Sequence, residues 1–201
     1  MADALPLILA SGSATRAKML RDAGVAIETA VPAIDEAEVK ASLQHDGAPA
    51  AKVAEILAEM KAQRIASRVR GRLVLGSDQM LECDGAWFDK PATREDARKQ
   101  LQFLRGKSHS LITSAVLVRD DARLWHTTDR AELRMREFSD AFLEHYLDHA
   151  GEDVLHSVGG YRLEGLGAQF FERVTGDFFT ILGLPLLPVL DILREHGMVT
   201  R

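Results

Sequence analysis

The most constraining feature of the sequence is an apolar run at residues 73–82 that has polar residues at its centre. The two ends of the run have the composition of a buried strand. The centre reads Gly-Ser-Asp-Gln, so the carboxylate of Asp78 falls inside that strand. A buried carboxylate is costly unless it meets a cation, a hydrogen-bond donor or an opening in the fold. Asp78 is therefore the first candidate for a functional residue, although an Asp bonded to backbone N–H groups at a strand end would give the same pattern.

A second candidate lies near the N-terminus, where an apolar strand at 5–10 leads through a small polar loop into a helix at 17–24. This order aims backbone N–H groups, the hydroxyls of Ser11 and Ser13 and the positive end of a helix at one place. Arg16 stands in the first turn, where a cation is unfavourable unless an anion compensates it. The loop is thus a candidate phosphate site; the alternative is a capping Ser with an exposed Arg.

An acidic turn follows a second strand at 25–31 and contains Asp35, Glu36 and Glu38. A solvated loop with an acidic helix cap explains it, but a metal-dependent phosphate enzyme needs oxygen ligands from more than one segment. Glu36 could supply one beside Asp78. The strongest helical pattern covers 49–69 and includes Lys61, and a lysine on a helix is usually solvated.

The remaining elements follow from local patterns. Asp84-Gly85 predicts a hairpin turn, and Thr93 and Ser139 are helix caps. The glycine-rich segment 157–167 predicts irregular backbone. We expect a hairpin of strands at 110–118 and 124–133, strands at 170–175 and 178–182, and a final helix at 184–193.

Composition limits the classes of protein that this chain can be. Its 201 residues, 46% of them hydrophobic, suit one globular domain over residues 1–201. A net charge of −5 disfavours binding to nucleic acid or to an anionic membrane. Cys83 is the single cysteine, which excludes an intrachain disulfide and fits a reducing compartment. The first residues lack the pattern of a secretory signal, so we expect a cytoplasmic protein.

Six short motifs together resemble the Maf family of nucleoside triphosphate pyrophosphatases, over about residues 5–195. They are Leu-Ile-Leu-Ala-Ser-x-Ser-x-x-Arg at 7–16, Asp35-Glu36, Gly76-Ser-Asp78, Lys90-Pro91, Glu164-Gly-x-Gly167 and Gly183-Leu-Pro185. The resemblance implies an α/β fold, with an elongated mixed β-sheet and flanking helices in two lobes around a cleft, similar to the inosine triphosphate pyrophosphatases. Family members often form homodimers.

The resemblance also implies a reaction, the metal-dependent hydrolysis of a nucleoside triphosphate to a nucleoside monophosphate and pyrophosphate. Ser11, Ser13 and Arg16 would hold phosphates, and Lys61 and Lys90 would neutralise their charge. Glu36 and Asp78 would bind Mg²⁺ or Mn²⁺, and Asp78 matches the family's proton acceptor. The sequence does not separate the role of ligand from that of base.

The base-binding residues favour one branch of the family. Gln79 and Glu164 resemble the 7-methyl-GTP branch, whereas the pyrimidine branch, which acts on dTTP and UTP, has Thr and Gln there. A carboxylate can accept both N–H donors of the guanine edge, which uracil and thymine lack. Thr15, also assigned to the base pocket, replaces the Trp that is typical of the 7-methyl-GTP branch, and Asp89 replaces the Gly before Lys90.

Three alternatives stay open at this stage. The enzyme could be a pyrimidine triphosphate pyrophosphatase, against which Gln79 and Glu164 argue. It could be a nucleotide-binding regulator, because the family name is associated with arrest of septum formation. A nucleic-acid-binding module ranks third, since aromatic and basic residues are not interleaved.

Overall fold

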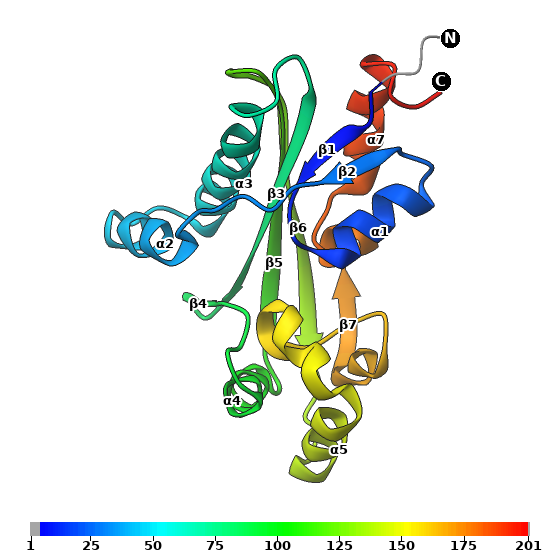
Figure 1. Cartoon of the computed structure of the whole chain (residues 1–201). Helices are drawn as coiled ribbons and strands as arrows, with labels where there is room; N and C mark the ends of the chain where they lie inside the picture. Colours follow the sequence, from blue (N-terminus) through cyan, green and yellow to red (C-terminus); the bar gives the residue numbers. More distant parts are fainter. Residues whose placement is uncertain (1–4, 201) are drawn as a thin grey trace. The chain divides into compact units, whose positions relative to one another are not determined.

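A computed structural model describes residues 5–200, which form two compact units (Figure 1). The first unit comprises the described residues of Met1–Gln79, Thr113–Asp129 and Phe178–Arg201, and the second comprises Met80–Ile112 and Arg130–Asp177. Three long strands contribute residues to both units: β3 (Leu73–Cys83), β5 (Ser108–Arg119) and β6 (Ala122–Met135).

The first unit contains a sheet with the strand order β2-β1-β3-β5-β6. Strand β1 runs parallel to both β2 and β3, with Ala10 opposite Gly76. The other elements of this unit are β1 (Leu7–Ala10), α1 (Ala14–Asp22), β2 (Ile27–Thr29), α2 (Glu36–His45), α3 (Ala50–Ala66), α6 (Phe178–Ile181) and α7 (Leu186–Glu195).

Helices cover both faces of this sheet (Figure 1). Alternate residues of the central strands point to opposite faces, so Leu9 and Leu75 pack with α1 and α7, while Ile8 and Val74 pack with α3. Burial on both faces explains why these strands are continuously apolar in sequence.

Helix α3 approaches β3 most closely at Gly76. A Cβ atom at this position would lie 2.0 Å from the backbone oxygen of Ala58 and 2.9 Å from the backbone nitrogen of Ala62. Only glycine permits that approach. Residue 78 lies two positions further along the strand and on the same face, so the close approach sets Asp78 beside Lys61, which lies in the same turn of α3 as Ala58 and Ala62.

The second unit holds the other ends of β3, β5 and β6, with antiparallel partners at both sides. Strand β4 pairs with β3, and β7 pairs with β6. Its remaining elements are β4 (Ala86–Phe88), α4 (Arg94–Leu104), α5 (Asp140–Ala150), the 3₁₀ helices Gly151–His156, Val158–Gly160 and Leu166–Phe170, and β7 (Phe171–Thr175).

The core of the second unit contains a buried histidine. His109 Nε2 lies 2.7 Å from the hydroxyl of Tyr161, and the imidazole also contacts Phe171. Burial lowers the pKa of His109 to about 4, because the charged form would lose its hydration.

The sequence predictions for fold class are confirmed: the chain is an α/β protein with a mixed sheet and flanking helices. The caps predicted at Thr93 and Ser139 are also present, with each side chain accepting a bond from the backbone three residues on. In the described part of the chain, residues 5–200, we find no helix long and apolar enough to cross a membrane.

One element was predicted wrongly. Residues 178–182 were expected to be a strand, but Phe178–Ile181 form the short helix α6. A short apolar run does not by itself distinguish strand from helix. Here the Thr180 hydroxyl donates to Asp129 Oδ2 at 2.7 Å and the carbonyls of Thr180 and Ile181 accept side-chain bonds, so tertiary contacts decide the conformation.

Replacing Gly76 by Ala should destabilise the protein by about 3 kcal/mol or more, because the added methyl group would collide with the backbone of α3 rather than with a mobile side chain. Urea unfolding followed by circular dichroism measures the loss. Gly165→Ala is the control, since a Cβ atom at residue 165 would have open space within 4 Å. Equal stability of the two variants would contradict the close packing.

Acid should destabilise the protein through His109. Its pKa in the folded state, about 4, lies below the value of about 6.5 in an unfolded chain, so the unfolded state binds the proton first as the pH falls. The free energy of unfolding should therefore fall by about 3 kcal/mol between pH 6.5 and 4 through this group. Urea titrations of wild type and His109→Gln across this range should give a flatter profile for the variant; parallel profiles would contradict the assignment.

Candidate active site

The predicted phosphate loop is built from the end of β1 and the start of α1. Ser13 caps α1 by accepting a bond from the backbone N–H of Arg16, at 3.3 Å. The buried Ser11 side chain accepts bonds from the Ser13 N–H, at 3.2 Å, and from Arg16 Nη1, at 3.3 Å. The three residues predicted for this loop are therefore close together, and their bonds hold the loop in one conformation.

Arg16 is anchored on its other side by the C-terminal segment. Its Nε donates to the backbone oxygen of Gly183 at 2.6 Å, and the Ser77 hydroxyl donates to the same oxygen at 3.0 Å. Burial lowers the pKa of Arg16, and the nearby carboxylates of Asp78 and Glu36 oppose that shift. The bonds to Gly183 and Ser11 use two of the five N–H groups of the guanidinium, so its other N–H groups can still bind an anion.

Lys61 joins the two predicted acidic residues. Its ammonium lies 2.6 Å from Asp78 Oδ1 and 2.9 Å from Glu36 Oε1. Lys61 and Asp78 are buried, whereas the Glu36 side chain is 42% exposed. Glu36 begins α2, where Asp35 caps the helix by accepting from the Glu38 N–H. The acidic turn is thus a helix start that places one carboxylate on the lysine.

The carboxylates offer oxygen atoms suited to a divalent cation. Asp78 Oδ2 is buried and makes no hydrogen bond to the residues that the structure describes. A buried carboxylate oxygen without a donor is a natural ligand for a hard cation. Within residues 5–200 we find no group of three or more His, Cys, Asp or Glu side chains placed to hold a metal. Glu36 and Asp78 thus supply carboxylate oxygen atoms of the kind that a divalent cation prefers.

Gln79 points to the opposite face of β3 from Asp78. Its Nε2 donates to Thr113 Oγ1 and to the backbone oxygens of Thr180 and Ile181, at 2.9, 2.9 and 3.1 Å. Thr113 and Thr180 are fully buried and Gln79 is half-buried. This predicted base-binding side chain is held by β5 and α6.

The other predicted site residues are Thr15, Lys90 and Glu164. Thr15 is partly exposed in the first turn of α1. Lys90 and Glu164 are exposed residues of the second unit, where Arg162 donates to Glu164 Oε1 at 3.0 Å and to Asp153. Their roles toward a substrate stay predictions.

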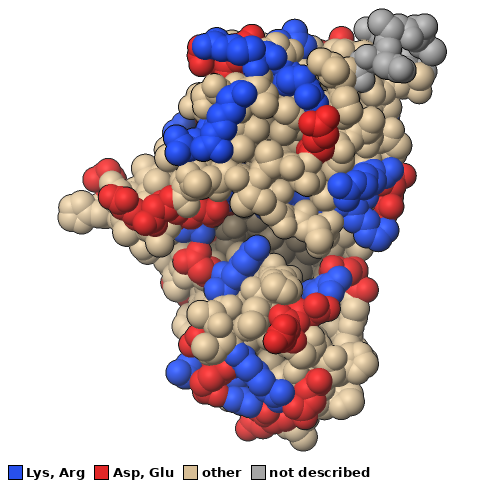
Figure 2. Space-filling model, in the orientation of Figure 1, with Lys and Arg blue, Asp and Glu red and all other residues tan. Residues whose placement is uncertain are grey.

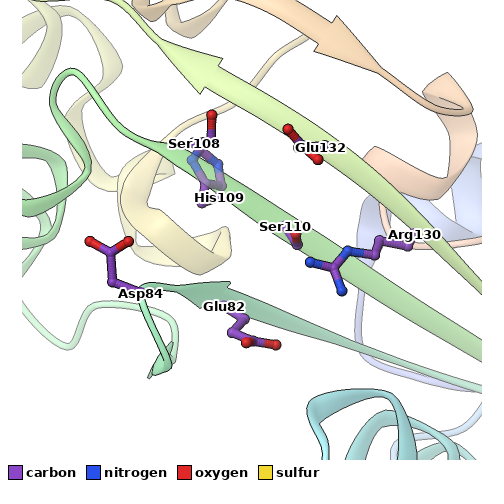
Figure 3. A pocket seen from close by; sticks show the side chains of 7 residues that line it. All are labelled: Glu82, Asp84, Ser108, His109, Ser110, Arg130 and Glu132. Atoms are coloured by element: carbon purple, nitrogen blue, oxygen red, sulfur yellow. The ribbon is translucent and has the colours of Figure 1, made fainter.

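The second unit also has a polar pocket of its own (Figure 3). The side chains come from β3, β5, β6 and the turn after β3, and they comprise carboxylates, hydroxyls, one imidazole and one guanidinium. Its lining residues are Glu82, Asp84, Ser108, His109, Ser110, Arg130 and Glu132. None of them belongs to the predicted site.

Sequence reasoning missed several residues that shape the site. Thr113 and Asp129 support the Gln79 network, and the Gly183 carbonyl accepts from both Arg16 and Ser77. Thr113 carried a usable signal, because it is a polar residue inside the apolar run 111–118, just as Asp78 is inside 73–82. The bonds to the Gly183 carbonyl could not be predicted, because no residue type marks which side chains a backbone oxygen will accept from.

On the visible face of the molecule, acidic and basic side chains are interspersed, without a continuous basic surface (Figure 2). This distribution agrees with the net charge of −5.

Comparison with known families gives a match over almost the whole chain. The model of the family described as Maf-like protein matches residues 6–196. The chain belongs to the Maf family. The residues gathered in the first unit of this Maf protein, namely Ser11, Ser13, Arg16, Glu36, Lys61, Asp78 and Gln79, all lie within the matched range.

Relatives of this Maf protein cover nearly its full length. A nucleoside triphosphate pyrophosphatase of Paramagnetospirillum magneticum is 57% identical over 190 residues, which are 94% of this chain and 98% of the relative. A protein of the same name from Granulibacter bethesdensis is 50% identical, over 98% of this chain and all of the relative. A 7-methyl-GTP pyrophosphatase of Rhizobium meliloti is 45% identical, over 96% of this chain and 97% of the relative.

Removing the buried cation of this Maf protein should cost stability. Lys61→Met is expected to lower the free energy of unfolding by about 3 kcal/mol or more, because the Asp78 carboxylate stays buried without its partner. The double variant Lys61→Met/Asp78→Asn should recover part of the loss. Urea unfolding measures both.

The matched control is Lys52→Met, on the same helix, where the lysine is half exposed and pairs with Glu55 at 3.3 Å. This variant should change stability little. Equal free energies of unfolding for Lys61→Met and Lys52→Met would contradict the buried ion pair between Lys61 and Asp78.

Proposed function

We propose that this protein is a metal-dependent pyrophosphatase that cleaves a nucleoside triphosphate between its α- and β-phosphates, with a guanine-type base such as that of 7-methyl-GTP preferred. The observation that supports it best is the ammonium of Lys61 bonded to both Asp78 and Glu36, close to Arg16 of the phosphate loop. Cations, carboxylates and a helix start at one place meet the needs of phosphoryl transfer.

The reaction needs a water to attack phosphorus while the bond to the bridging oxygen breaks. Asp78 would accept the proton of the water through Oδ2, since Oδ1 is bonded to Lys61. The products are a nucleoside monophosphate and pyrophosphate. Lys61 holds Asp78 in position and offsets the negative charge around the reacting phosphate.

A bound Mg²⁺ or Mn²⁺ would polarise the phosphate oxygens and orient the water. Glu36 and Asp78 are the residues that would hold it, because both carboxylates reach the same ammonium and Asp78 Oδ2 has no donor in the described chain. Because ligation and proton acceptance at Asp78 need the same oxygen atom, Oδ2, the two roles are alternatives for this residue.

The phosphate loop would bind the phosphates without moving. Its serine side chains are already bonded within the loop, so the ordering cost falls on folding rather than on binding. Arg16 points its remaining donors from a fixed position, and a triphosphate would compensate its charge.

Base preference rests on Gln79 and Glu164. In the guanine edge two adjacent N–H groups face outward, and a carboxylate such as that of Glu164 can accept both. The 7-methyl-GTP pyrophosphatase among the relatives, at 45% identity, supports this choice over a pyrimidine triphosphate. We include Lys90, a phosphate-binding residue, and Thr15, a neighbour of the base, on the family resemblance alone.

A location in the reducing cytoplasm and assembly as a homodimer complete the proposal. The single cysteine, Cys83, is buried as a free thiol, which suits a reducing compartment. The dimer is proposed from the family resemblance.

Pyrophosphate release from 7-methyl-GTP, GTP, UTP and dTTP tests the proposal. Wild type with Mg²⁺ or Mn²⁺ should turn over 7-methyl-GTP at least about tenfold faster than UTP, and Asp78→Asn should lower kcat by about 10²–10⁴-fold through loss of the proton acceptor. Removing the metal with EDTA should abolish release, and adding it back should restore it.

Asp121→Asn, an exposed carboxylate of the same unit, is the control and should keep wild-type rates. Preference for UTP or dTTP would overturn the base assignment and leave the chemistry. No release from any triphosphate with either metal, together with retained nucleotide binding by calorimetry, would favour the regulator.

A further inference from the structure

The side of β3 opposite the proposed catalytic carboxylate carries a network of buried and half-buried polar groups. Gln79, Thr113, Thr180 and Asp129 come from β3, β5, α6 and β6, all within the first unit. The Thr113 hydroxyl donates to the backbone oxygen of Thr180 at 2.9 Å, and the Thr180 hydroxyl donates to Asp129 Oδ2 at 2.7 Å. Buried groups in such a network have few alternative partners.

The donors and acceptors around Gln79 permit one orientation of its amide. Nε2 faces the backbone oxygens of Thr180 and Ile181 and the hydroxyl oxygen of Thr113. A backbone carbonyl can only accept, and the single proton of the Thr113 hydroxyl is already donated to Thr180. Turning the amide over would set Oε1 against three oxygen atoms, so the amide is locked with Oε1 on the side away from them.

The short helix α6 is what supplies the two carbonyl groups. The bond from Thr180 to Asp129 fixes the side chain of the residue whose carbonyl accepts from both Gln79 and Thr113. Thr113 bridges the pair, since its one hydroxyl accepts from Gln79 and donates to Thr180. A valine at 113 would have the same shape and make neither bond.

We propose that Thr113 is a positioning residue that, together with the two carbonyl groups of α6, makes Gln79 an acceptor-only contact for the base. A Gln that could turn over would accept from one base and donate to another; held by Thr113 and these carbonyls, it presents only Oε1. The site would then favour a base edge rich in N–H donors, as in guanine, over the pyrimidine edge, where one N–H lies between two carbonyl oxygens. This inference rests on the proposed function and extends it to a residue that does not itself touch substrate.

Kinetics of Thr113→Val and Thr113→Ser test the specificity part. Valine should lower the ratio of kcat/KM for 7-methyl-GTP to that for UTP by about three- to tenfold, which is the range of one hydrogen bond. The loss should appear in KM, with kcat little changed, because Asp78 lies on the other face of β3. Serine keeps the hydroxyl and should restore the wild-type ratio. An unchanged ratio in Thr113→Val, with active wild type, would overturn the inference.

Side-chain amide exchange tests the orientation without any turnover. In protein labelled with ¹⁵N-glutamine, the signals of the Gln79 NH₂ group are identified by their absence in Gln79→Met. They should exchange with solvent at least about tenfold more slowly than those of the exposed Gln63, and more quickly in Thr113→Val than in Thr113→Ser.

The two experiments separate the possible failures. Rapid exchange of Gln79 in wild type would overturn the locked amide, whatever the activity, and needs no variant to fold. Slow exchange together with no turnover of any triphosphate would overturn the proposed function and with it the specificity role, while the network itself would stand.

Discussion

The site depends on one buried ammonium group. Lys61 offsets the negative charges of Asp78 and Glu36, and without it the buried Asp78 carboxylate would lose its paired cation. Two features of the backbone make this arrangement possible. Gly76 lets α3 lie against β3, and Asp35 caps the start of α2, where Glu36 reaches the Lys61 ammonium. The need to neutralise these buried charges thus holds α2, α3 and β3 together. Arg16 of the predicted phosphate loop lies close enough to feel the charges of Asp78 and Glu36.

Successive side chains of β3 point to opposite faces of the sheet, and this separates two groups of predicted site residues. Asp78 and Gln79 are neighbours in sequence but point to opposite faces of β3, one toward α3 and the other toward α6. Under the proposed function, chemistry on the phosphate and recognition of the base would therefore rely on separate sets of supporting residues. Substitutions of the residues that contact Gln79 would then alter the choice of base while the carboxylate of Asp78 keeps its surroundings.

Much of this was predictable, and the limits have physical causes. A carboxylate within an apolar strand singled out Asp78, and the order strand, polar loop, helix singled out Ser11 and Arg16. Lys61 looked like an ordinary surface lysine, because its burial depends on Gly76 and on packing that no local pattern records. The run 178–182 was assigned as a strand for the same reason: bonds from Gln79 and to Asp129, far away in sequence, make it helical.

The discontinuity of the first unit has a consequence for biosynthesis. Its final segment begins at Phe178, and that segment supplies the Gly183 carbonyl which holds Arg16 and Ser77. Every residue of the second unit precedes it. On the ribosome, where domains fold as their residues emerge, the second unit can be complete while the phosphate loop still lacks its anchor. The nascent chain thus completes its proposed nucleotide site last.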